Sequence, residues 1–96
     1  MDNRDILTSI GEFQKQAKHK YRIKKIGIFG SCARNAMNQE SDVDVVVELD
    51  DQDLFNLIGI KQELEALLNR HVDIVSYRNS MNPYLRKKID NEAVYV

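Results

Sequence analysis

The chain has 96 residues, with 14 lysines and arginines against 15 aspartates and glutamates and a formal net charge of −1. Domains that hold nucleic acid by bulk charge are usually strongly basic, so direct nucleic-acid binding is not expected. The length fits one small domain over residues 1–96, and any active site must then be built on a single core or completed by a partner.

Membrane and disulfide-rich classes are also disfavoured. No apolar run approaches the roughly 20 residues that a membrane span needs. The N-terminal sequence MDNRDILTSIGEF lacks the charged-then-apolar layout of a secretory signal. Cys32 is the only cysteine, which excludes an internal disulfide and fits a reducing compartment. We expect a soluble, cytoplasmic protein with no membrane partner.

The first half of the chain predicts a helix, a strand and a sharp corner. Apolar residues recur at helical spacing over roughly residues 4–18, which indicates an amphipathic helix. Residues 22–30, RIKKIGIFG, are rich in β-branched side chains and end in glycine, which is typical of a strand of about five residues that stops at Gly30. Ser31 then stands where a helix N-cap belongs, and the sequence SCARNAM favours a short helix or turn.

The second half continues the alternation. Residues 42–49, DVDVVVEL, form the clearest strand pattern, and a long apolar stripe at helical spacing follows over residues 53–70. HVDIVSY, residues 71–77, predicts a third strand, and residues 83–89 a last helix before the short strand AVYV. This order predicts an α/β (α+β) domain, a small mixed sheet with helices mainly on one face.

Two aspartates lie one residue apart on the clearest strand. Residues i and i+2 of a strand point to the same side, so Asp42 and Asp44 should emerge together, opposite a row of valines. Such like charges raise each other's pKa unless a cation sits between them, and Mg²⁺ prefers oxygen ligands. Asp73 joins them if its strand is a neighbour in register. Three carboxylates can hold two Mg²⁺ ions about 3.5–4 Å apart, which favours nucleotidyl or phosphoryl transfer.

The corner before these aspartates suits a phosphate group. Gly30 lets the backbone approach a ligand, and the first turn after it offers free N–H groups. Ser31 adds a hydroxyl donor, and Arg34 adds a cation. Ser31 as a simple helix cap and Arg34 as a solvated surface charge are the alternatives.

Together these motifs resemble a known family. GSCAR, six further residues, SDVDVVVE and later VDIV resemble the signature of the nucleotidyltransferase superfamily that includes DNA polymerase beta. The match runs from about Lys24 to Tyr77, so the chain resembles a minimal nucleotidyltransferase, the MNT type. The resemblance implies a polymerase beta-like fold and an antitoxin that pairs with a HEPN-domain ribonuclease toxin in a hetero-oligomer. It also implies Mg²⁺-dependent transfer of AMP from ATP to a tyrosine of that toxin.

The resemblance assigns roles to individual residues. Gly30 and Ser31 would hold the triphosphate, Asp42 and Asp44 would bind both metals, and Asp73 would bind the metal nearest the attacking hydroxyl. Relatives usually carry glycine where this chain has Asn35, which is expected to leave the phosphate loop less open.

Other readings remain open at this stage. The chain could neutralise its partner by binding alone, or transfer nucleotides to a small molecule or an RNA end. The two histidines, His19 and His71, show no ligand-spaced partner in the sequence and are interpreted as surface or strand-end residues.

Overall fold

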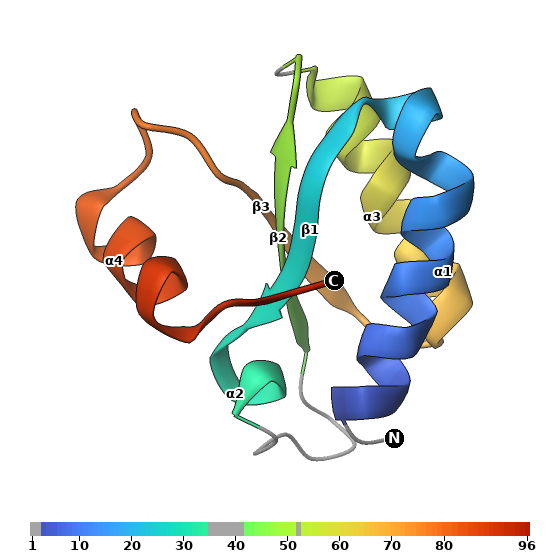
Figure 1. The fold of residues 1–96 in the computed structure, drawn as a ribbon, viewed down its shortest axis with the longest axis horizontal. Coiled ribbons are helices and arrows are strands. Elements are labelled where there is room, and N and C mark those ends of the chain that lie inside the picture. Colours follow the sequence, from blue (N-terminus) through green and yellow to red (C-terminus); the bar gives the residue numbers. More distant parts are fainter. Residues whose placement is uncertain (1–2, 35–41, 52) are drawn as a thin grey trace.

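A computed structural model describes residues 3–34, 42–51 and 53–96, and these ranges contain four helices and four strands (Figure 1). In chain order the elements are α1 (Asn3–Tyr21), β1 (Ile23–Phe29), α2 (Gly30–Ala33), β2 (Val43–Leu49), α3 (Leu54–Leu68), β3 (Val72–Ser76), α4 (Pro83–Glu92) and β4 (Val94–Tyr95). No helix in these ranges is long and apolar enough to cross a membrane.

The four strands form one sheet in the order β3-β2-β1-β4. β2 and β3 run parallel and are joined through α3, whereas β1 is antiparallel to both β2 and β4. A parallel pair needs a crossover connection of this kind, and α3 supplies it. The predicted mixed sheet is therefore confirmed.

The two long helices cover one face of the sheet, as expected (Figure 1). α1 and α3 pack there on alternate residues of the strands, which contribute Val43, Val45, Val47 and Val72 to the main core. Each of these four valine side chains is fully buried. The apolar faces of the two helices thus pack on the apolar face of the sheet and form one layer, whose burial supplies most of the driving force for folding.

α4 lies against the opposite face, which therefore carries apolar residues as well as the carboxylates. A second, smaller core forms where Ile89 of α4 meets Phe29 and Val46 of the sheet. Val46 shares its side of β2 with Asp44, and it is fully buried because α4 covers it. Part of the predicted polar face is therefore apolar and covered, which places α4 close to the aspartates.

The helix ends follow local hydrogen bonding. The side chain of Asp53 caps α3 by accepting a hydrogen bond of 2.8 Å from the Phe55 backbone N–H, as predicted. α3 ends where Asn69 adopts a left-handed φ of 53°, which turns the chain into β3. α1 runs to Tyr21 rather than to about residue 18, because Tyr21 is itself part of the buried face.

Gly27 of β1 allows β4 to approach closely, and this contact can be tested. A Cβ at Gly27 would lie 2.9 Å from the Tyr95 Cα and would also collide with the Val94 carbonyl oxygen. We expect Gly27→Ala to lower the free energy of unfolding by about 1–3 kcal/mol, the usual cost of overpacking. Urea unfolding followed by circular dichroism measures it.

Gly11→Ala is the matched control. Gly11 lies in α1 with no atom within 4 Å of an added Cβ, so the same substitution should raise stability by about 0.5–1 kcal/mol through helix propensity. Equal effects of the two substitutions would contradict the close packing of β4 on Gly27.

Candidate functional site

Two of the predicted aspartates lie side by side on neighbouring strands. β2 and β3 pair in parallel with Val43 opposite Val72 and Asp44 opposite Asp73. Because the paired valines point into the main core, the two aspartates point to the other side of the sheet. The expectation that β2 and β3 are neighbours in register is thus confirmed.

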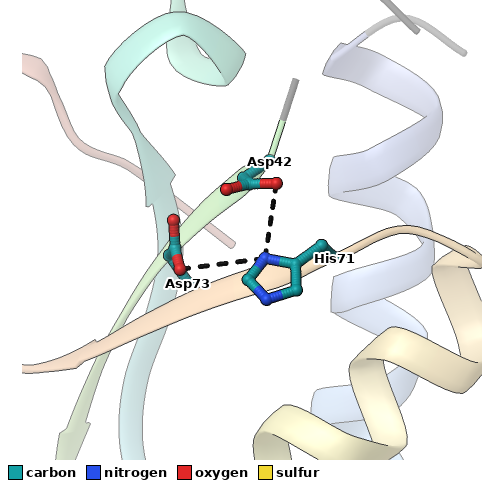
Figure 2. Close-up of side chains that lie close together, drawn as sticks. All are labelled: Asp42, His71 and Asp73. Carbon is teal, nitrogen blue, oxygen red and sulfur yellow. Dashed lines mark ion pairs between the residues drawn. The ribbon is translucent and has the colours of Figure 1, made fainter. Parts of the chain in front are cut away.

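Asp42 comes just before β2 and joins the same cluster through a histidine. The Nδ1 atom of His71 lies 3.3 Å from Oδ1 of Asp42 and 3.8 Å from Oδ1 of Asp73 (Figure 2). One ligand atom from each of these three residues falls within 4.8 Å of the other two. The three side chains are 47–56% exposed, so a solvent ion can reach them.

His71 is an exposed residue directly before β3, as interpreted from the sequence, but it does have neighbours at ligand distance, which the sequence did not reveal. Asp42-Val43-Asp44 and His71-Val72-Asp73 share the same spacing at the starts of β2 and β3, and parallel pairing of the strands brings His71 beside Asp42. Applying the i, i+2 rule to both strands would have found it. The sequence does not show that the two strands are neighbours, and this left the histidine unassigned.

A fourth carboxylate lies behind the histidine. Oε2 of Glu65, on α3, accepts a hydrogen bond of 3.0 Å from the Val72 backbone N–H and lies 3.9 Å from Nε2 of His71. The imidazole therefore has Glu65 on one nitrogen and the two aspartates on the other.

The glycine of the corner contacts the carboxylate of Asp44. Gly30 has a φ of +69°, and a Cβ at this position would lie only 2.5 Å from Oδ2 of Asp44. Glycine is required here for two reasons, the left-handed backbone and the space that the aspartate occupies. The corner and the carboxylates thus form one continuous site.

Ser31 does not cap α2, in contrast to the prediction. α2 begins at Gly30, the N-cap position is Phe29, and no side chain makes a capping hydrogen bond there. The strand passes directly into the helix through the left-handed glycine, which leaves Ser31 inside the first turn and partly buried. Asn35, at the predicted end of this loop, lies outside the described residues.

Arg34 is held by an acidic residue of α4. Its Nη1 atom lies 2.8 Å from Oε1 of Glu92, and its side chain is 52% exposed. The pair joins the turn after α2 to the last turn of α4, on the covered face of the sheet. Arg34 is thus neither a simple solvated charge nor free of a competing anion, and a phosphate would have to compete with Glu92 for it.

The electrostatics of the cluster centre on Asp44. Burial raises the pKa of the Asp44 carboxyl above its ordinary value, and the negative charges of Asp73 and Asp42 raise it further. The cations Lys88 and Arg34 oppose this rise only in part. Asp44 is therefore a carboxylate whose ionised form is disfavoured by its surroundings.

The donor set fits a divalent cation. Carboxylate oxygens are the ligands that Mg²⁺ prefers, and a cation between the strands would remove the repulsion among the aspartates. Asp42 and Asp73 supply oxygens and His71 one imidazole nitrogen within 4.8 Å of one another, whereas Asp44 lies outside this group but beside Asp73 on the paired strand. Next to them, the open backbone at Gly30 leaves room for an anion that the cation would also attract.

The sequence matches the family described as "Nucleotidyltransferase domain" over residues 10–96. The chain belongs to this family. One relative, the protein adenylyltransferase MntA of Thermococcus cleftensis, is 33% identical over 93 residues, which cover 96% of this chain and 93% of the relative. The resemblance to minimal nucleotidyltransferases is thus confirmed, and so is the enzyme class.

Solved structures agree with this nucleotidyltransferase fold. A structure described as a candidate minimal nucleotidyltransferase superimposes with a TM-score of 0.80 and 30% identity, covering 98% of this chain and 95% of that chain. A complex described as a tri-AMPylated Shewanella oneidensis HEPN toxin with an MNT antitoxin gives a TM-score of 0.71 at 20% identity, covering 97% of this chain and 70% of that chain. The second likeness supports the fold alone.

The contact between Gly30 and Asp44 leads to a first prediction for this site. We expect Gly30→Ala to lower the free energy of unfolding by about 1–3 kcal/mol for the left-handed backbone alone, with a further loss from the collision with Asp44. In an Asp44→Ala background the collision disappears and only the backbone cost should remain. A double-mutant cycle by urea unfolding measures the difference, and additive effects would contradict the contact.

The raised pKa of Asp44 leads to a second prediction for this site. A raised pKa stabilises the fold only at low pH, and this contribution is lost as the pH rises through the folded-state value, so the ionised carboxylate costs stability at neutral pH. We expect Asp44→Asn in EDTA to raise the free energy of unfolding by less than about 1 kcal/mol, because solvent screens this partly exposed carboxyl. Added Mg²⁺ should stabilise the unmodified protein more than the variant.

Asp53→Asn is the control for that experiment, because asparagine caps a helix about as well as aspartate and this cap belongs to α3. It should leave both the stability and the response to Mg²⁺ nearly unchanged. A destabilised Asp44→Asn variant in EDTA would show that the carboxylate is a structural group.

Proposed function

We propose that this nucleotidyltransferase is an antitoxin that transfers AMP from ATP to a tyrosine hydroxyl of a HEPN-domain toxin and thereby silences it. The observation that carries the proposal is the parallel register that brings Asp44 beside Asp73, with Asp42 in the same cluster, in a chain that matches its family over residues 10–96. The name of the Thermococcus relative and the description of the Shewanella complex support the acceptor as a partner protein.

The proposed reaction is an in-line displacement at phosphorus. The tyrosine oxygen attacks the α-phosphorus of ATP and forms a new O–P bond. The bond from the α-phosphorus to the bridging oxygen of the β-phosphate breaks, and pyrophosphate leaves with the electron pair. The hydroxyl proton passes to a carboxylate of the site or to water, so the products are the tyrosine–AMP ester and pyrophosphate.

The residues divide this work by position. Asp42, just before β2, and Asp44, on β2, would hold metal, whereas Asp73 on β3 would hold metal on the side of the attacking hydroxyl and help that hydroxyl lose its proton. When bound, two Mg²⁺ ions would neutralise charge on the triphosphate and stabilise the attacking and leaving oxygens. Asp42 and Asp73 are about half exposed, Asp44 is partly buried, and Asp44 and Asp73 lie side by side on the paired strands, which suits such a site.

The glycine corner is proposed to hold the triphosphate. Gly30 leaves open backbone beside Asp44, and Ser31 lies in the first turn of α2, where its hydroxyl and backbone N–H can reach an anion. Arg34 is proposed as a phosphate ligand that exchanges Glu92 for the nucleotide. The proposal further includes a cytoplasmic location, where ATP is available, and a hetero-oligomer formed with the toxin.

The competing function is neutralisation by binding alone. In that case the carboxylates would be dispensable, and the complex would form and silence the toxin without ATP. The unfavourable environment of Asp44 argues against this alternative, because a binding surface gains nothing from a carboxylate that its own neighbours destabilise.

Label transfer tests the proposal directly. The protein is incubated with its co-expressed partner, Mg²⁺ and ATP labelled at the α-phosphate, and the products are separated on a denaturing gel. We expect label on the partner, and Asp44→Asn should reduce the rate by more than about 100-fold, beyond what loss of an outer-shell group costs. Phenylalanine substitutions in the partner then locate the acceptor tyrosine.

The controls separate the possible outcomes. Asp53→Asn should label the partner normally, because it changes one aspartate outside the cluster. Silencing of the partner by Asp44→Asn without any label would establish the binding-only function. Label on a small molecule or on RNA, with none on protein, would replace the proposed acceptor.

A further inference from the structure

We propose that His71 is itself a ligand of the metal site, so that the site combines carboxylate oxygens with one imidazole nitrogen and binds Mn²⁺ more tightly than carboxylates alone would. The inference rests on the proposed function only in requiring that this cluster bind a divalent cation. It does not depend on the acceptor or on AMP transfer.

The backbone holds His71 in place. Its carbonyl oxygen accepts a hydrogen bond of 2.9 Å from the Val43 N–H, which joins the start of β3 to the start of β2. The parallel register continues from this point with Val43 opposite Val72. His71, directly before β3, and Asp73, on β3, are two residues apart, and their side chains lie on the same side, with Nδ1 of His71 3.8 Å from Oδ1 of Asp73. The histidine therefore faces the aspartates because of the sheet itself.

The atom separations match those of ligands around one ion. Adjacent ligands of an octahedral ion with bonds of about 2.1 Å lie about 3.0 Å apart, and opposite ligands about 4.2 Å apart. His71 Nδ1 is 3.3 Å from Asp42 Oδ1 and 3.8 Å from Asp73 Oδ1, and all three atoms fit within 4.8 Å (Figure 2). Shifts of a few tenths of an ångström, within the reach of exposed side chains, would bring the three onto one cation.

Glu65 lies on the side of His71 where a ligating histidine usually has a carboxylate partner, although the 3.9 Å to Nε2 is longer than a hydrogen bond. Such a histidine donates its second ring N–H to a carboxylate, which fixes the tautomer and leaves the other nitrogen free for the metal. Here Glu65 is fixed by the Val72 N–H and lies on the Nε2 side of His71. With the proton on Nε2, the lone pair of Nδ1 would point toward Asp42 and Asp73, where a single divalent cation would satisfy all three groups.

The nitrogen changes which metal is preferred. Carboxylates alone suit Mg²⁺, whereas imidazole adds affinity for first-row transition ions. Mn²⁺ accepts both kinds of ligand and can replace Mg²⁺ at such sites. Removing His71 should therefore weaken Mn²⁺ binding more than Mg²⁺ binding and reduce the selectivity between the two.

The experiment uses Mn²⁺ itself as the probe on the full chain without nucleotide or partner. Pulsed electron paramagnetic resonance detects coupling of bound Mn²⁺ to a directly ligated ¹⁴N nucleus, and titration of free Mn²⁺ gives the affinity. We expect an imidazole ¹⁴N coupling in the unmodified protein that is absent in His71→Gln, with Mn²⁺ affinity reduced by about 10- to 100-fold and Mg²⁺ affinity reduced less. His19→Gln, which changes the other histidine of the chain, should alter neither.

Each alternative outcome has a distinct meaning. Bound Mn²⁺ without ¹⁴N coupling in the unmodified protein overturns the inference, and this reading does not require any variant to fold. Tighter binding of both metals by His71→Gln also overturns it, because the imidazole would then act as a competing cation. A ¹⁴N coupling in a protein that labels no acceptor would uphold the inference while the proposed function fails.

Discussion

The parallel pairing of β2 with β3 is the constraint on which the site depends. Val43 and Val72 are paired in the main core, and this places Asp44 beside Asp73 on the other side of the sheet. A slip of one residue would turn the aspartates into the layer beneath α1 and α3, where an unpaired charge is very costly. Burial of the valines therefore sets the geometry of the carboxylates, and no separate interaction among the acids is needed to hold them together.

α4 packs on the same face of the sheet that carries Asp44, opposite α1 and α3. Ile89 anchors it on Phe29 and Val46, and the same helix carries Lys88 near Asp44 and Glu92 against Arg34. Covering Val46 also removes water from around Asp44. The packing that stabilises this face therefore disfavours the ionised form of the carboxylate. Stability and electrostatic strain in this region therefore have a common origin.

Much of this could be predicted from periodicity. The apolar stripes gave the helices, and the alternation of valine with aspartate placed both acids on one side of a strand. Contacts between segments that are far apart in the sequence could not be predicted. Arg34 pairs with Glu92, 58 residues later, and α4 covers the face of the sheet that carries Asp44. The position of His71 beside Asp42 could have been predicted, because its spacing to Asp73 repeats that of Asp42 to Asp44. That prediction requires knowing that β2 and β3 are neighbours.

The balance of these forces bears on whether the cluster is catalytic or a passive surface. At Asp44 an amide would fill the same space without the charge that burial and Asp73 disfavour, so a chain selected only for stability and contact would be better served by asparagine. A bound cation reverses this comparison, because it turns mutual repulsion among the acids into shared attraction. The arrangement of the acids therefore suits a bound divalent cation better than it suits a surface that serves for contact alone.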